Sequence, residues 1–261
     1  CGDGITVENH MGSGSMIVYP KYIQYNYIQY CASYGMECWN IPGVAYIRNN
    51  TIQNSGVQGT CDGSGLFNED SGIRLFGDNN VVEYNLIKNN PGSGIVVVNE
   101  SSSNSANNRI SKNVIYANGR LSLDYQPFNS VKNPNGNGVT ANDGLYGGGV
   151  NKGMDYPIFT VVGISGNNMY VKGYVGSAPN QSTFAGATVE IYKADNDGNN
   201  YGEAVNGDGL SKPHGEGRYY LGSITTDPNG NFETNVTIDP SLVFAGDNLT
   251  GTATINNNTS E

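Results

Sequence analysis

The sequence is poor in charge, in histidine and in cysteine. Asp, Glu, Lys and Arg make up only 14% of its 261 residues, with 13 basic side chains, 23 acidic ones, two histidines and four cysteines. The basic residues are scattered singly, so they form no run that could neutralise phosphates, and nucleic acid is excluded as a partner. No Cys-x-x-Cys spacing occurs, which argues against a structural zinc site.

Long apolar runs are also missing, and we therefore predict no transmembrane segment. Glycine (37 residues), tyrosine (18 residues) and asparagine are instead abundant. Tyrosine and β-branched residues favour strands, whereas glycine and asparagine favour tight turns. The composition thus predicts many short strands joined by tight corners rather than a disordered chain.

One short line recurs four times in the first half of the chain: KYIQYNYIQYC, AYIRNNTIQNS, VVEYNLIKNN and RISKNVIYAN. The four lines align on Asn26, Asn50, Asn85 and Asn113, with an apolar residue three positions before each asparagine and an isoleucine two positions after it. A repeat built only from short strands and corners is typical of a solenoid. We predict that each asparagine stands at a fixed corner, in a left-handed conformation or bonded to a neighbouring coil.

A second register, small–apolar–x–apolar, lies between these lines. Together the two registers predict a right-handed parallel β-helix over residues 1–125, with alternate residues facing its interior. The predicted inner ladder is Met16/Val18, Met36/Cys38, Ile73/Leu75, Ile95/Val97 and Leu121/Leu123.

The longest step of the repeat contains residues 58–71, which we expect to loop out of the coil. Cys61 lies on this excursion, and Cys31 stands next to the point where it leaves. We therefore predict an extracellular disulfide between Cys31 and Cys61. Cys38 falls on the inner ladder, which favours a buried apolar role, and Cys1 is not placed.

The repeat stops near residue 125. Residues 126–155 are rich in turn formers and predict a connecting region. Separate alternating runs then fill residues 156–261, and the Asp227-Pro228-Asn229-Gly230 stretch predicts a tight hairpin. Six or seven short strands in this length are typical of an immunoglobulin-like β-sandwich.

Several stretches carry a family resemblance: NRISKNVIYANG with LSLDY, then GVTANDG, MDYPIFT, GEGRYYLGSITTDPNGNF and TATINNNTSE. They resemble secreted or surface right-handed parallel β-helix repeat proteins, of the pectate-lyase-like superfold, with a C-terminal immunoglobulin-like domain. The resemblance covers nearly the whole chain and implies an extracellular or cell-surface location. In that family the segment matching NGNGVTANDG is typically rich in Asp, whereas here Asp143 stands nearly alone.

The β-helix also serves as a scaffold for polysaccharide lyases and hydrolases, so we looked for clustered charges. Glu37 and Arg74 are predicted on adjacent coils, with Asp70 beside them on the excursion. A carboxylate pair or a carboxylate with a base could act on a sugar chain. The structural alternative for the same residues is a cross-strand ion pair.

Calcium is the one metal that we consider, and no other cofactor is expected. Asp195 and Asp197 begin DNDGNN, which looks like the start of a calcium loop but lacks its terminal acid, so a hairpin tip is the alternative. Asp143 is the third candidate. His214 and Glu216 lie in a stretch that we predict to be an exposed loop.

Sugars enter the prediction in two ways. The tyrosines of YIQYNYIQY (residues 22–30) could form an aromatic surface on which sugar rings stack. Asn-x-Ser/Thr acceptor sites for glycosylation occur at Asn49, Asn99, Asn180, Asn235, Asn248, Asn257 and Asn258.

These features predict an extracellular structural or adhesive surface protein. Neither end of the sequence shows a capping element, so we expect self-association, as in a fibre or filament built head to tail, or contact with neighbouring domains of a longer chain. The alternatives are a carbohydrate-active β-helix enzyme and a non-catalytic module that binds surface glycans.

Overall fold

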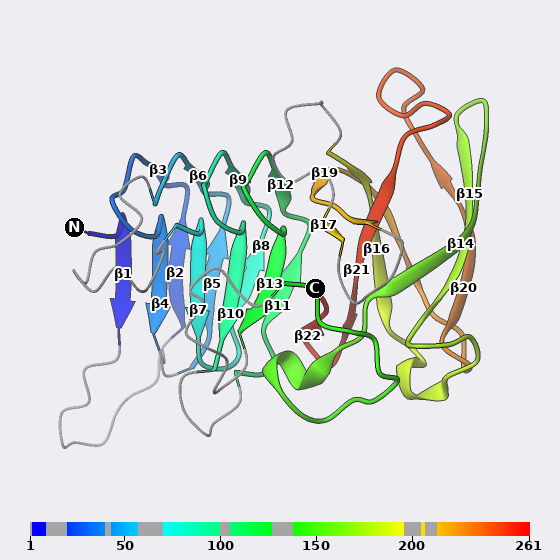
Figure 1. Ribbon diagram of the computed structural model, residues 1–261, viewed down its shortest axis with the longest axis horizontal. Helices are drawn as coiled ribbons and strands as arrows, with labels where there is room; N and C mark the ends of the chain where they lie inside the picture. Colours follow the sequence, from blue (N-terminus) through cyan, green and yellow to red (C-terminus); the bar gives the residue numbers. More distant parts are fainter. Residues whose placement is uncertain are drawn as a thin grey trace.

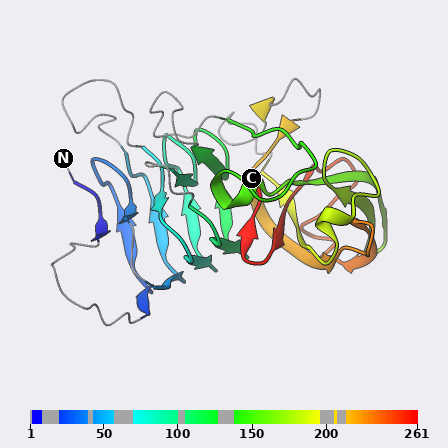
Figure 2. The ribbon, with the colours of Figure 1, turned by 90° about the horizontal axis from the view of Figure 1, so that it is seen from below.

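The structure, a computed structural model, describes residues 2–8, 20–39, 43–56, 70–99, 105–126, 138–195, 205–206 and 213–261. Strands up to Gln126 are parallel, and those from Pro157 onward are antiparallel. The two parts lie end to end along the long axis, with the C-terminus at their junction (Figures 1 and 2). The predicted fold class, an all-β solenoid followed by a sandwich of antiparallel sheets, is confirmed.

Three parallel sheets form the walls of the solenoid, and each coil adds one strand to each sheet. The first sheet contains β1 (Ile5–Glu8), β4 (Met36–Trp39), β7 (Ile73–Phe76), β10 (Ile95–Val98) and β13 (Leu123–Gln126). The second contains β2 (Lys21–Gln24), β5 (Ala45–Arg48), β8 (Val81–Glu83) and β11 (Arg109–Ser111), and the third contains β3 (Tyr27–Gln29), β6 (Thr51–Gln53), β9 (Leu86–Lys88) and β12 (Val114–Tyr116).

The interior of the solenoid follows the predicted alternation over its central coils. Met36, Ile73 and Ile95 stand in register on successive strands and are fully buried. In the first coil Ile5 and Val7 hold the corresponding positions, and the predicted Met16 and Val18 lie outside the described residues.

The register predicted for the last coil was wrong by two residues. Leu123 and Tyr125, rather than Leu121 and Leu123, align with Ile95 and Val97. Ser122 precedes Leu123 as Gly94 precedes Ile95, so Ser122 is the small residue of the repeating pattern. The two residues lie in close contact: a Cβ placed on Gly94 would lie only 2.7 Å from the Ser122 carbonyl oxygen. The pattern is therefore read as SLDY and not as RLSL.

Asparagine ladders bind the corners of successive coils together, as predicted. The Asn50 backbone N–H and side-chain Nδ2 both donate to Asn85 Oδ1, at 3.0 and 2.9 Å. Asn85 makes the same pair of bonds to Asn113, at 3.0 and 2.9 Å. Nδ2 of Asn85 also donates to the Ile47 carbonyl at 2.9 Å, so each amide joins three coils. These side chains satisfy buried backbone groups that the strands leave unpaired.

Two more ladders stand at the other corners. One joins Ser55 to Asn90 and Asn118, and the other joins Asn80 to Asn108. The residue just before each ladder position has a positive φ, as at Asn49 (54°) and Asn89 (56°). Asparagine tolerates this left-handed conformation better than most residues do.

The sandwich has two main sheets around its own core. One sheet has the order β14 (Pro157–Ser165), β15 (Asn168–Val175), β20 (Asn231–Thr237). The other has the order β19 (Gly217–Thr225), β16 (Thr188–Ala194), β21 (Leu249–Ile255), β22 (Asn258–Thr259), and β17 (Val205–Asn206) pairs with β18 (Pro213–His214). Met169, Val171, Phe184, Val189 and Ile191 are fully buried between the main sheets. Short 3₁₀ turns occur at η1 (Val150–Gly153) and η2 (Ser182–Phe184).

Replacing Asn85 with alanine tests the ladder. The change leaves the Asn50 N–H and the Ile47 carbonyl without their partners in a buried corner, and we expect it to lower the free energy of unfolding by about 3 kcal/mol. Equilibrium urea denaturation followed by fluorescence measures this loss. Asn26→Ala is the matched control, because within the described residues Asn26 Oδ1 accepts no bond from a preceding coil; we expect it to cost about 1 kcal/mol or less. Equal losses in the two variants would show that the ladder is not the source of the stability.

Candidate functional site

Glu37 and Arg74 lie opposite each other on β4 and β7, as predicted. Arg74 Nη1 donates to Glu37 Oε1, and the two side chains are only 8% and 15% exposed. The guanidinium group also lies over the rings of Trp39 and Tyr34, at 4.9 and 5.7 Å from their centroids. The carboxylate and the cation are thus held against each other and against aromatic rings, which is the geometry of a structural ion pair.

Asp70 lies at the corner that precedes β7 and is buried. Burial raises the pKa of its carboxyl to about 6, against an opposing effect from the Arg120 charge. Arg120 lies at a corner of a later coil. The charge that acts on Asp70 therefore comes from Arg120, whereas Arg74 is paired with Glu37. A catalytic role for the three residues stays a prediction.

The most elaborate polar arrangement is the junction between the last coil and the sandwich. A further coil would supply acceptors for the outward backbone N–H groups of residues 107–125, and here side chains from beyond the solenoid supply them instead. The donor and acceptor pairs are Asn107 with Asn258, Asn108 with Asn151, Ile110 with Thr259, Lys112 with Glu190, Ala117 with Asp195, Asn118 with Glu216, and Tyr125 with Glu261.

Glu190 of β16 shows how one side chain closes the edge. Its Oε2 accepts from the Lys112 N–H at 2.9 Å, and its Oε1 accepts from the Ser111 hydroxyl at 2.5 Å. The Tyr192 hydroxyl donates to the same carboxylate at 2.5 Å. Glu190 is 5% exposed. The sequence feature that could have indicated this role is a glutamate in the middle of the strand segment ATVEIYKA. The strand is buried on both faces, so a glutamate there needs a hydrogen-bonding partner.

Asp195 and Glu216 close the neighbouring corner. Asp195 Oδ2 accepts from the Ala117 N–H at 3.0 Å, and its Oδ1 accepts from Arg218 at 2.9 Å. Glu216 accepts from the Asn118 N–H at 2.9 Å and from its side-chain amide at 2.6 Å. The prediction that Glu216 lies in an exposed loop was wrong, because both carboxylates are fully buried against the last coil.

The calcium candidates do not come together in the part of the chain that the structure describes. Both Asp195 oxygens already accept hydrogen bonds, Asp143 Oδ1 accepts from the Leu145 N–H at 2.8 Å, and Asp197 lies outside the described residues. Within the described ranges no group of three or more His, Cys, Asp or Glu residues could hold a metal ion.

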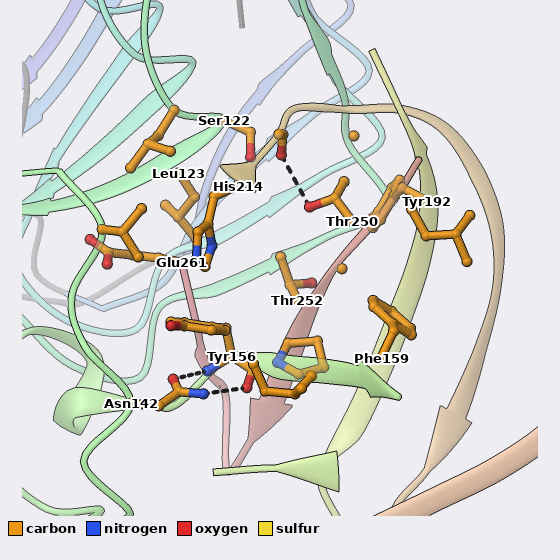
Figure 3. A pocket seen from close by; sticks show the side chains of 18 of the residues that line it. Ser122, Leu123, Asn142, Tyr156, Phe159, Tyr192, His214, Thr250, Thr252 and Glu261 are labelled. Carbon is orange, nitrogen blue, oxygen red and sulfur yellow. Dashed lines mark hydrogen bonds between the residues drawn. The ribbon is translucent and has the colours of Figure 1, made fainter. Parts of the chain in front are cut away.

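A cavity of about 520 Å³ lies beside these acceptors, between the last coil and the sandwich (Figure 3). Leu123 of the solenoid and Phe159 and Tyr192 of the sandwich line it, so its wall is mainly apolar. His214 meets the Tyr156 ring edge-on, with the centroids 4.5 Å apart. This corrects the prediction of an exposed loop for His214 as well, since its side chain lies at the cavity wall.

Among the described residues, Glu261 contributes the carboxyl group of the cavity lining. The carboxyl group accepts hydrogen bonds from the Tyr125 and Thr140 backbone N–H groups, and burial raises its pKa well above the usual range. This group thus serves the junction and does not form a carboxylate pair facing the cavity. The space suits an apolar group better than a reacting sugar.

The cysteines are free thiols wherever the structure describes them. Cys31 is half-buried, and Cys38 is fully buried in the solenoid core, where burial raises its pKa to about 12. Cys61 itself lies outside the described residues, but the structure shows no disulfide at Cys31 and does not support the predicted Cys31–Cys61 bond.

Two of the seven glycosylation candidates are inaccessible in the folded chain. Asn99 accepts from the Ser105 N–H and Asn258 accepts from the Asn107 N–H, and both are buried. The exposed candidates are Asn49, Asn180, Asn235, Asn248 and Asn257.

Tyrosines occupy strained corner positions in the coils far from the sandwich. Tyr25 and Tyr30 have φ angles of 60° and 56° and are 75% and 67% exposed. In the next coil the same corners carry Asn49 and Asn54, also with positive φ. A left-handed conformation costs a residue such as tyrosine about 1–2 kcal/mol, and side chains so exposed recover little of it by packing.

No protein-family model matches the sequence. Among the described residues, no helix is long and apolar enough to cross a membrane.

The buried carboxyl groups predict that stability falls as the pH rises. Burial raises the pKa of Glu216 from 4.5 to about 8, so the folded protein keeps a proton that the unfolded chain releases near pH 4.5. The stabilising effect is complete below pH 4.5 and is lost as the pH approaches 8. We expect the free energy of unfolding to fall by up to about 1.4 kcal/mol per pH unit between pH 6 and 8.

Chemical denaturation at a series of pH values measures this slope, and Glu216→Gln should reduce it by the share that Glu216 contributes, since the raised pKa of Glu261 adds a slope of the same sign. Asp155→Asn is the control, because burial raises the pKa of Asp155 only to about 6 and its effect lies below that pH. A slope between pH 6 and 8 that Glu216→Gln leaves unchanged would contradict the assignment.

Proposed function

We propose that this protein is an extracellular structural or adhesive component of a cell surface, in which the solenoid is a rigid spacer and the sandwich is its fixed end piece. The resemblance to secreted β-helix proteins with an immunoglobulin-like domain supports this location. The proposal rests mainly on the junction. A chain that joins its two parts through buried acceptors cannot bend freely between them.

The burial at the junction supports a load-bearing role. Glu190, Asp195, Glu216 and Thr259 are each at most 5% exposed, and each accepts a backbone N–H of the last coil. Separating the two parts would exchange these hydrogen bonds for bonds to water, a net loss of about 0.5–1.5 kcal/mol for each bond. Solenoid and sandwich should therefore act as one mechanical unit.

Negative-stain electron microscopy of the protein isolated without refolding from the cells that make it tests the proposal. Together with immunogold labelling of intact cells, it should show rods or fibres on the cell surface. A protein found only inside the cell would contradict it.

Self-assembly is a second candidate, favoured by the edge of the sandwich. Val162 and Ile164 of β14 pair with Val171 and Met169 of β15 and so share their inward face. Val171 and Met169 are fully buried, whereas Val162 and Ile164 are 46% and 37% exposed. Among the described strands β14 has only one neighbour, β15. An apolar strand edge of this kind can accept a further strand from another copy.

A charge on this edge should block assembly. Val162→Lys places a cation where an added strand would pack, and we expect sedimentation velocity to show monomer at concentrations at which the unchanged protein forms larger species. Because Val162 is half exposed, the free energy of unfolding should change by about 0.5 kcal/mol or less. Thr188→Lys, at an exposed position of β16, which has neighbouring strands on both sides, is the matched control and should leave assembly intact. An unchanged protein that stays monomeric at every concentration would rule out self-assembly through this edge.

A further inference from the structure

The first two coils carry five tyrosines, four of them strongly exposed, on two adjacent walls of the solenoid and at the corners beside them. We define the tyrosine platform as Tyr22, Tyr25, Tyr27, Tyr30 and Tyr46, which lie on β2, β3 and β5 and at the corners between and after these strands. The first four are 61%, 75%, 63% and 67% exposed. The rings of Tyr22 and Tyr46 stack in parallel, with centroids 5.1 Å apart and planes inclined by 11°.

Folding alone does not account for the platform. Tyr25 and Tyr30 stand in left-handed conformations at corners where the following coil uses asparagine, and they pack against little. Strained residues that the core does not require point to a functional role. The rigid ring of tyrosine, with few rotatable bonds, also offers contact area at a small entropy cost.

The groups around the rings indicate the chemistry of the ligand. Amide side chains flank them: Gln53 Nε2 donates to the Tyr27 hydroxyl at 2.8 Å and to Gln29 Oε1 at 3.2 Å. Arg48 lies over one of the stacked rings, 4.4 Å from the Tyr46 ring centroid, and pairs with Glu83 at 2.7 Å. Aromatic faces beside amides and hydroxyls, with the local charge neutralised, fit an uncharged polyhydroxylated chain.

Electrostatics disfavour the charged alternatives. The chain carries a formal net charge of −10, which repels anionic polymers. Among the described residues, the Glu83 carboxylate beside the platform is already paired with Arg48 and Arg109 and so is not offered to a cationic partner. A neutral ligand thus matches both the platform and the field of the whole protein.

We propose that the tyrosine platform binds neutral polysaccharide by stacking of sugar rings on Tyr25 and Tyr30, with a hydrogen bond donated by Gln29 Nε2 and one accepted by Gln53 Oε1. This inference deepens the adhesive role proposed above and supplies its ligand class. Many copies on one surface would multiply the weak affinity of a single platform.

Affinity gel electrophoresis with mannan, xyloglucan and mixed-linkage glucan as neutral probes, and polygalacturonate as the acidic comparison, tests the proposal. We expect the unchanged protein to be retarded by at least one neutral polymer and not by polygalacturonate. The Tyr25→Asn/Tyr30→Asn double variant should bind that polymer at least tenfold more weakly. Its thermal midpoint should stay equal or rise, because asparagine suits the left-handed corners.

The stability readout separates a binding role from a structural one. A double variant that loses stability, or one that binds as the unchanged protein does, would overturn the proposal. So would the absence of binding to all three neutral polymers, or binding of polygalacturonate alone.

Tyr84→Asn is the matched control, since Tyr84 has the same corner position, a φ of 59° and an exposed ring, but lies one coil beyond the platform beside Lys112. It should leave binding unchanged, and equal weakening would place the ligand elsewhere and overturn the assignment. The sedimentation and microscopy experiments probe surface location and assembly independently of sugar binding. Failure of this inference is therefore distinguishable from failure of the proposed function.

Discussion

Each coil of the solenoid depends on acceptors for the backbone N–H groups that point toward the next coil. Along the strands these acceptors are carbonyl oxygens, as when the Ile73 N–H donates to Gly94 at 2.9 Å. At the corners, asparagine side-chain oxygens of the next coil accept from the backbone N–H groups in place of carbonyl oxygens. Backbone bonds also run back to the preceding coil, as when the Leu86 N–H donates to the Asn50 carbonyl at 2.8 Å. The rod is held by these bonds between coils, because an unpaired buried donor costs more than a typical hydrogen bond gains.

The same requirement explains the sandwich. The last described coil is followed by the sandwich and not by another coil. Carboxyl, amide and hydroxyl oxygens from residues 151–261 accept from its backbone N–H groups instead. Carboxyl groups suit this role because each brings two oxygens that can accept hydrogen bonds. Their burial has an electrostatic consequence, since it raises the pKa of Glu216 and links the stability of the junction to pH. Shape, rigidity and pH dependence thus have a common origin in one edge of unpaired N–H groups.

The surface of the first coils follows a different rule from the interior. Inside, the repeat uses the residues that pack and pair best. Outside, it places tyrosines at corners that asparagine would fill with less strain. Sequence reasoning found these tyrosines and the Glu37–Arg74 pair, because both lie within short stretches whose register the repeat sets. It treated Glu216 as a solvated loop residue, because its acceptor role depends on an N–H group 98 positions away.

The repeat by itself determined the parallel solenoid, the ladder of Asn26, Asn50, Asn85 and Asn113, and the buried positions of the central coils; the ladders through Asn90 and Asn80 are seen only in the structure. These features depend on periodicities of two residues along a strand and of one coil along the chain, and both can be read from the order of residues. Only the tertiary structure decided the register of β13 and the identity of the acceptors at the junction. Lys112 and Glu190 are 78 residues apart, and no local pattern relates them. Their pairing arises because the sandwich packs against the last coil and brings a carboxylate to a donor that has no further coil to reach.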